Sequence, residues 1–96
     1  MGSHYRMTYV TAEDLKTLPI QQLIAYRLKN LRIQKCLTQE ELAFEAGVER
    51  SYIGQIERCE KNVTVVTLLK IAKSFDLDLL EFLDFTPLID RRIRRK

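Results

Sequence analysis

Apolar residues recur at intervals of three or four along most of the chain, which is the spacing of one face of a helix. The longest stripe predicts a helix from Pro19 to about Lys35. Its apolar members are Ile20, Ile24, Leu28 and Leu31. A later stripe, which follows Thr64 as a candidate N-cap, consists of Leu68, Ile71, Ala72 and Phe75. No Val-, Ile- or Thr-rich run alternates as a half-buried strand would, so we expect an all-α fold.

Capping residues mark where further helices begin. Thr38 with Glu41, and Asp78 with Glu81, match the capping box, in which two side chains three residues apart satisfy each other's backbone N–H groups. They predict one helix that begins at residue 39 and another that runs from about 79 to 85. Each of these helices has an acidic residue in its first turn, where the helix dipole favours negative charge.

Two of the predicted helices meet at a tight turn. Gly47 ends the helix that begins at residue 39, because glycine accepts the positive φ that a helix end often requires. A new helical pattern, with Ile53 and Ile56 inward, predicts a helix over 50–57. Two short helices joined by a turn that contains glycine form a helix-turn-helix.

Composition limits the classes of function. The 96 residues suit one domain, and no segment approaches the roughly 20 apolar residues of a membrane span. The two cysteines, Cys36 and Cys59, have no CxxC neighbour, and the one histidine, His4, lies in a tag-like start, so we expect no metal site. Without a histidine base, a phosphate-binding loop or a hydrolase motif, we expect neither an enzyme nor a cofactor. No secretory signal opens the chain, which favours the cytoplasm and free thiols.

Basic and acidic residues are concentrated in different segments of the chain. Five basic residues and no acid lie between residues 15 and 38, and five acids and no base lie between 74 and 90. The last six residues add five positive charges, without which the chain is close to neutral. This separation suits a molecule that sets one face against a polyanion, although solvated helix faces would produce the same pattern.

The segment Gln39 to Arg58, QEELAFEAGVERSYIGQIER, resembles the helix-turn-helix of the Cro/phage-repressor family, also known as the xenobiotic-response-element type. The resemblance extends from about Leu23 to Leu83. It implies a five-helix, all-α DNA-binding domain, with double-stranded DNA as partner. We accordingly expect an N-terminal arm with a tag remnant over 1–10, a domain over 11–86 with its motif at 39–58, and a basic tail over 87–96. Thr11 with Asp14 is a weaker capping box and predicts a short extra helix near 12–18.

In this family the third helix enters the major groove. The resemblance therefore implies base-reading roles for Arg50, Ser51, Tyr52 and Gln55. Arginine can grip guanine O6 and N7, and glutamine can bond adenine through two atoms. The alternative is that these are ordinary polar residues on an exposed helix.

The resemblance also implies contacts that set the register on DNA. The candidate phosphate contacts are Thr38, Gln39, Arg58, Lys61, Asn62 and Thr64. It further implies a partly buried ion pair between Arg32 and Glu57. Cys36 and Cys59 stand where the family usually has glycine at helix ends, and a left-handed backbone there costs a non-glycine residue about 1 kcal/mol. Either the local backbone adapts at these two positions, or the protein tolerates the strain.

Within the family, the run ERSYIGQIERCEKNVTVVTLLKIAK is similar to the controller proteins of restriction–modification systems. Those are small dimers that bind operators upstream of their own gene and the endonuclease gene. The resemblance thus implies a homodimer on palindromic operators, with no small-molecule ligand because the chain leaves no room for a sensing domain. A surplus of apolar residues near the C-terminus is the candidate dimer interface: Leu80, Leu83, Phe85 and Leu88.

Two alternatives stand beside this interpretation. The C-terminal segment could fold back and cover the apolar patch within one chain. The protein could also be an antitoxin, or another protein-interaction module of a toxin–antitoxin pair, with DNA binding as an autoregulatory function.

Overall fold

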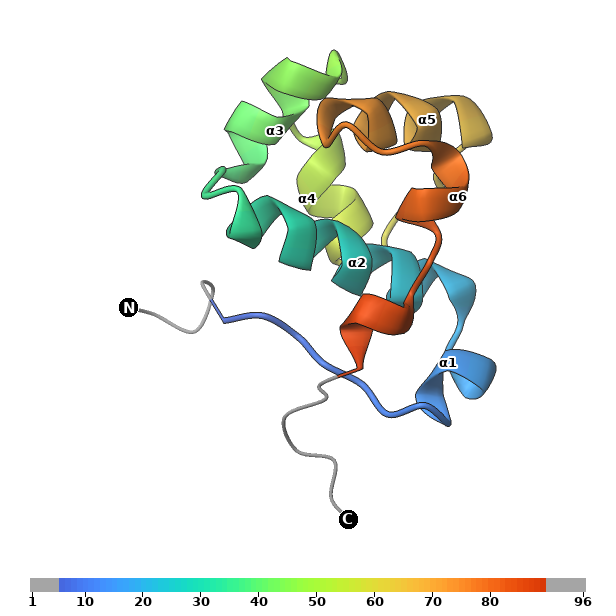
Figure 1. The fold of residues 1–96 in the computed structure, drawn as a ribbon. Helices are drawn as coiled ribbons and strands as arrows, with labels where there is room; N and C mark the ends of the chain where they lie inside the picture. Colours follow the sequence, from blue (N-terminus) through green and yellow to red (C-terminus); the bar gives the residue numbers. More distant parts are fainter. Residues whose placement is uncertain (1–5, 90–96) are drawn as a thin grey trace.

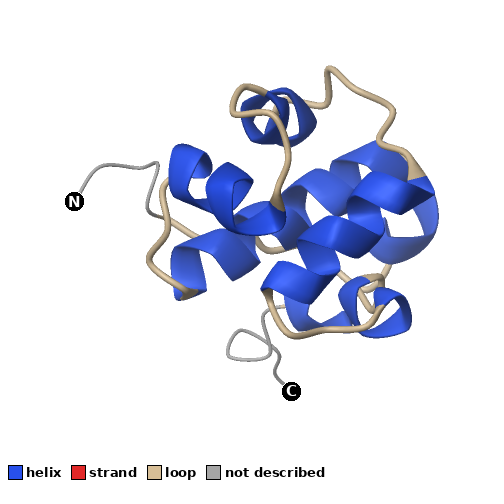
Figure 2. Cartoon of the chain, turned by 90° about the horizontal axis from the view of Figure 1, so that it is seen from above, coloured by secondary structure: helices blue, strands red, loops and turns tan. Residues whose placement is uncertain are grey.

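The computed structural model describes residues 6–89, and within that range it contains helices and loops but no β-strand (Figures 1 and 2). The helices are α1 (Asp14–Thr17), α2 (Ile20–Gln34), α3 (Gln39–Ala46), α4 (Tyr52–Glu57), α5 (Val65–Ser74), α6 (Leu79–Phe82) and a 3₁₀ helix, η2 (Thr86–Leu88). The predicted all-α class is confirmed, and α1 is the short extra helix that was expected before the five helices of the domain.

Three predicted boundaries were wrong by a few residues. Pro19 is the N-cap of α2 and lies outside the helix. Helix α4 begins at Tyr52, so residues 50 and 51 belong to the turn that precedes it. Helix α6 ends at Phe82 because a new turn follows, in which Asp84 accepts hydrogen bonds from the backbone and hydroxyl of Thr86.

One fully buried side chain from each of α2 to α6 builds the centre of the core. These residues are Leu28, Leu42, Ile53, Ile71 and Phe82, each with a relative exposure of 0%. Burial of such a side chain is worth about 1.5–3 kcal/mol, so this cluster carries much of the stability. The predicted stripe of α2 was wrong at one position: Ile20, in its first turn, is 54% exposed.

Four helices end on a residue with left-handed backbone. The residues are Cys36 (φ 58°), Gly47 (71°), Cys59 (60°) and Asp76 (60°). In each case the N–H of the next residue bonds a carbonyl five residues back, at 2.8–3.0 Å, which is the Schellman closure of a helix end. Of the two alternatives left open at the cysteines, the protein keeps the left-handed backbone and tolerates its strain, and the left-handed backbone at Asp76 was not predicted.

The two ends of the described chain pack together along α2 (Figure 1). The N–H of Val10 bonds the carbonyl of Leu88 at 2.9 Å, and Thr8 exchanges two hydrogen bonds with the buried amide of Asn30, at 2.8 and 2.7 Å. The predicted boundaries at 10 and 87 therefore cut through packed structure. The parts of the expected arm and tail at 1–5 and 90–96 lie outside the described residues.

Arg27 connects α2 to the end of α6 from inside the protein. Its Nε donates to the carbonyl of Phe82 and its Nη2 to that of Glu81, both at 2.9 Å. Burial lowers the pKa of this guanidinium, and the nearby Asp84 carboxylate opposes that shift. The bonds satisfy carbonyls that a helix end leaves without partners.

None of the helices among residues 6–89 has the length and apolar character needed to cross a membrane.

Candidate nucleic-acid interface

The helix-turn-helix is assembled from local signals in the sequence. The hydroxyl of Thr38 accepts the N–H of Glu41, whose carboxylate accepts the N–H of Thr38 in return, so α3 begins on a complete capping box. Gly47 ends α3 in the left-handed region. In Figure 1, α4 then crosses α2 between α3 and α5, with Ile53 and Ile56 buried against them.

The four predicted base-reading residues lie at and just before the start of α4. Arg50 and Ser51 are exposed in the turn, while Tyr52 and Gln55 are half-buried on the first turn and a half of the helix. The Arg50 side chain is 74% exposed and lies 3.5 Å from the Glu40 carboxylate. The N–H of Ser51 donates to Glu49 at 3.0 Å, and its hydroxyl donates to the same oxygen.

An open depression of about 620 Å³ lies beside this edge of α4. Ser51, Tyr52 and Gln55 line one side of it. Lys61 also lines it, with its ammonium 5.8 Å from the centre of the Tyr52 ring, within the range of a cation–π contact. The structure thus brings three base-reading candidates and one phosphate candidate around one hollow.

Thr67 and Lys70 also line this depression, and the sequence reasoning missed them. They are three residues apart on the outer face of α5. That spacing on a helix directly after a predicted phosphate-contacting loop is the signal that could have found them.

Arg32, Glu57 and Gln39 form one half-buried network. The Arg32 guanidinium bonds both oxygens of the Glu57 carboxylate, at 2.7 and 3.1 Å, and the side chains are 11% and 5% exposed. The remaining Arg32 nitrogen donates to the carbonyl of Leu37 at 2.7 Å, and Gln39 donates to Glu57 at 2.9 Å. The ion pair expected from the family resemblance is present, and it also holds Gln39, a predicted phosphate contact.

Gly54 is a further residue that the sequence reasoning missed. It is buried on α4, and a Cβ there would lie 3.0 Å from Arg58 Nη1 and 3.1 Å from Gln39 Oε1. The missing side chain lets two predicted phosphate contacts approach the recognition helix closely.

The loop after α4 holds the remaining phosphate candidates in defined positions. Arg58 forms two hydrogen bonds to Glu60, at 2.9 and 3.1 Å. The Asn62 side-chain oxygen accepts a hydrogen bond from the Gln21 side chain at 2.6 Å, and the Asn62 NH₂ group has no acceptor among the described residues. Gln21, on the first turn of α2, was not among the predicted residues.

The two threonine candidates differ in what their hydroxyls do. Thr38 accepts the N–H of Glu41, and no acceptor for its own O–H occurs among the described residues. Thr64 caps α5 by accepting the N–H of Thr67, and it also donates to the Thr67 hydroxyl at 3.0 Å. The Thr38 hydroxyl can therefore donate to a new acceptor such as a phosphate, whereas the Thr64 hydroxyl would first have to break its hydrogen bond to the Thr67 hydroxyl.

Hydrogen bonding perturbs three titratable groups on this surface. The Ser51 hydroxyl and N–H lower the pKa of Glu49, and the hydrogen bonds from Arg58 lower the pKa of Glu60. The same bond raises the pKa of Arg58. All three groups thus remain charged on an exposed surface. Residues 6–89 contain no cluster of three or more metal-ligating side chains.

The predicted dimer residues are only partly on the surface. Leu80 is 81% exposed on α6, with Leu69 of α5 at 39%. Leu83 and Phe85 are half-buried against the core. Leu88 was wrongly assigned: it is 1% exposed because the C-terminal segment folds back and packs with the N-terminal segment beside α2. That alternative is therefore correct for Leu88, while Leu80 stays uncovered.

A short helix held by a tight glycine turn, with its polar edge outward and two further helices supporting it, defines a helix-turn-helix protein. The chain belongs to the helix-turn-helix family, whose model matches residues 28–82.

Relatives within this family include control proteins. The chain is 36% identical to control protein C.SmaI of Serratia marcescens over 70 residues, which span 73% of this chain and 83% of that protein. It is 36% identical to control protein C.BamHI of Bacillus amyloliquefaciens over 70 residues, which span 72% and 86% of the two chains.

The chain is also similar to solved structures of controller proteins. The restriction–modification controller protein C.AhdI of Aeromonas hydrophila has a TM-score of 0.61 and 42% identity, with 65% of this chain and 94% of that chain covered. The C.Esp1396I controller tetramer, in complex with its natural 35 base-pair operator, has a TM-score of 0.63 and 31% identity, with coverages of 68% and 86%.

Proposed function

We propose that this protein is a sequence-specific DNA-binding transcriptional regulator of the restriction–modification controller type, which binds palindromic operators as a homodimer. One observation carries the proposal: the polar edge formed by the turn at Arg50 and Ser51 and by Gln55 of α4 faces outward beside an open depression that Lys61 and Lys70 also line. The chain's similarity to control proteins supports the same conclusion.

On this proposal the edge of α4 enters the major groove. Arg50 reads guanine through its guanidinium fork, Gln55 reads adenine, and the Tyr52 ring packs on a thymine methyl. Lys61 and Asn62 contact phosphate after the helix, and Thr38 contacts phosphate before it. These contacts come from both sides of α4 and therefore set its position along the groove.

A second copy of the chain supplies the second half of the operator. Half-sites of this class lie about 34–36 Å apart, one turn of DNA, and a two-fold dimer matches a palindrome. The uncovered Leu80 and Leu69, on α6 and α5, form the surface we assign to the partner copy. The related controller protein C.Esp1396I forms a tetramer in complex with its natural 35 base-pair operator.

The remaining features of the proposal follow from the DNA partner. A regulator of operators acts in the cytoplasm, where bacterial DNA lies, and it requires neither catalysis, nor a cofactor, nor a small-molecule ligand.

The test is selection of bound duplexes from a random-sequence pool, followed by affinity measurements on the enriched sequence. We expect a palindromic consensus with half-sites one turn apart and an affinity at least about 10³-fold above that for a scrambled duplex. Equal affinity for the enriched and scrambled duplexes would overturn the proposal.

A further inference from the structure

Three exposed glutamates, Glu40, Glu49 and Glu60, each interact with a residue that is predicted to contact DNA. Glu40 lies 3.5 Å from Arg50, and Glu60 bonds Arg58 through two atoms at 2.9 and 3.1 Å. Glu49 accepts both the N–H and the hydroxyl of Ser51. Each carboxylate is thus paired with a residue predicted to contact DNA.

This arrangement is unfavourable for simple attraction to DNA. Non-specific binding comes from lysine and arginine neutralising phosphates, so each acidic residue near the duplex weakens it. Glu40 and Glu60 cancel the charges of Arg50 and Arg58. On the loop after α4, Lys61 is a cation with no carboxylate within 4.0 Å among the described residues. The surface is therefore only weakly attractive to phosphate alone.

The ion pair at Arg50 leaves guanidinium N–H groups free to bond a base. Glu40 approaches Arg50 at Nη2, so Nε and Nη1 of the guanidinium stay available for hydrogen bonds. Glu60 occupies Nε and Nη2 of Arg58, and Nη1 lies against the buried Gly54 of α4, so this arginine has less charge to offer a phosphate. A guanidinium held on one side by a carboxylate is orientated for a base on the other side, and it is less drawn to phosphate.

We infer that Glu40, Glu49 and Glu60 determine specificity, because they restrain Arg50, Ser51 and Arg58 and repel phosphate, so that tight binding depends on the correct bases. The inference rests on the proposed function and adds a mechanism by which the same surface rejects DNA of the wrong sequence. The three carboxylates would thus disfavour the complex with DNA of the wrong sequence more than the complex with the operator.

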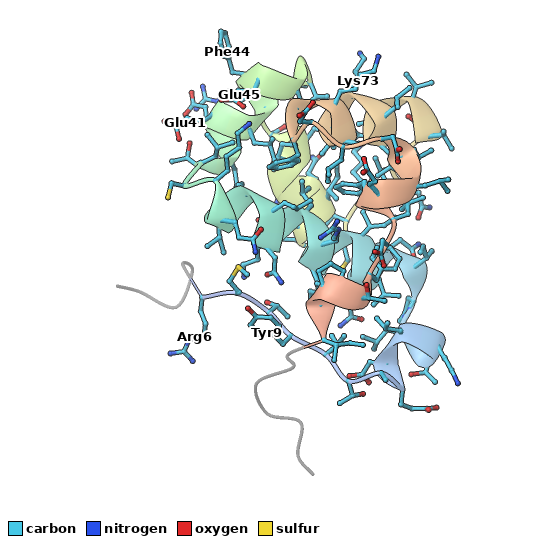
Figure 3. All side chains as sticks on the ribbon, viewed as in Figure 1. Arg6, Tyr9, Glu41, Phe44, Glu45 and Lys73 are labelled. Carbon is cyan, nitrogen blue, oxygen red and sulfur yellow. The ribbon has the colours of Figure 1, made fainter. Side chains whose placement is uncertain are left out.

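The test compares Glu→Gln variants, which keep side-chain shape and one acceptor oxygen. The single variants are Glu40→Gln, Glu49→Gln and Glu60→Gln, and a pair combines Glu40→Gln with Glu60→Gln. The matched control pair is Glu13→Gln with Glu45→Gln. Glu45 lies beside Phe44 on α3 (Figure 3) and pairs with Lys35 at 3.2 Å rather than with a predicted DNA contact. Both pairs raise the net charge equally, and all four residues are exposed.

Affinities are measured on a 30 base-pair duplex of random sequence and on the duplex enriched by selection. We expect each single variant to bind the random duplex about threefold more tightly, and the Glu40–Glu60 pair about tenfold, from lost repulsion and freed cations. Affinity for the enriched duplex should change by less than about twofold, since lost repulsion and lost orientation oppose each other. The ratio of the two affinities therefore falls about tenfold, and it stays constant in the control pair.

Two results would overturn the inference. One is an unchanged affinity ratio in the Glu40–Glu60 pair, and the other is the same fall in the control pair. Failure of the proposed function is a separate outcome, because wild-type protein would then bind the random and enriched duplexes equally. Unfolding curves for every variant establish that the exposed substitutions leave the fold intact.

Discussion

The Arg32 guanidinium bonds both oxygens of the Glu57 carboxylate, at 2.7 and 3.1 Å, and so joins the end of α2 to the last residue of α4. The two side chains are 11% and 5% exposed, so the pair lies largely out of water. The proposed function requires that α4 be held at a constant angle to the rest of the domain, and this contact holds one end of it.

Loss of either partner should destabilise the fold strongly. Glu57→Gln removes the charge that Arg32 faces and leaves a mostly buried cation, for which we expect a loss of about 3–5 kcal/mol in the free energy of unfolding. Urea denaturation measures it. The double variant Arg32→Met, Glu57→Leu should recover much of that loss, because apolar residues can replace a buried pair. A single-variant loss below about 1 kcal/mol would mean that the pair is solvated.

Glycine at the two cysteine positions should stabilise the protein. Cys36 and Cys59 have φ values of 58° and 60°, a backbone that disfavours side chains by about 1 kcal/mol. Cys36→Gly and Cys59→Gly should each raise the unfolding free energy by about 0.5–1 kcal/mol in urea melts. Gly47→Ala is the converse control: its Cβ would meet nothing within 4 Å, so the expected loss of about 1 kcal/mol is backbone strain alone. Destabilisation by both glycine variants would contradict this account.

Arg50→Ala should affect the reading of one base. The side chain is 74% exposed, so the fold should not change. We expect a loss of about 1–3 kcal/mol on the enriched duplex, with relaxed preference at one base pair of each half-site. Affinities for a set of duplexes substituted at single positions measure this. Equal losses on enriched and random duplexes would show that Arg50 contacts phosphate only.

Lys61→Ala should act on all sequences alike. Its ammonium lies over the Tyr52 ring, and a cation there neutralises phosphate without reading a base. Affinity should fall similarly for enriched and random duplexes, and the slope of log K against log salt should become shallower by about one. A salt titration of both duplexes gives the slope, and an unchanged value would exclude a phosphate contact.

Leu80→Glu should weaken dimerisation without unfolding the monomer. Leu80 is 81% exposed, so the substitution should change monomer stability by less than about 0.5 kcal/mol. Sedimentation equilibrium should show a higher dimer dissociation constant. Leu88→Ala is the contrasting variant: Leu88 is 1% exposed, and the cavity should cost about 2–5 kcal/mol of folding stability. If Leu80→Glu leaves the dimer unchanged, the partner copy binds elsewhere.

Much of the helix-turn-helix could be predicted because its signals are local. A capping box acts within four residues, and the boxes at Thr38 and Asp78 were both found in the structure. A positive φ at a helix end is equally local, which is why the backbone at Gly47 could be expected, whereas at Cys36 and Cys59 only the structure decided between a strained and an adapted backbone. Arg32 and Glu57 are 25 residues apart, and only the family resemblance, not spacing or composition, indicated that they would meet.

The sequence by itself therefore determined the all-α class, the order of the helices and the position of the recognition motif, since periodicity and caps are properties of neighbouring residues. Only the tertiary structure decided that Leu88 is buried while Leu80 is exposed, because burial depends on which distant segments pack against a side chain. It also decided that Glu40 would lie 3.5 Å from Arg50, because that pairing depends on how α3 is placed relative to the turn before α4.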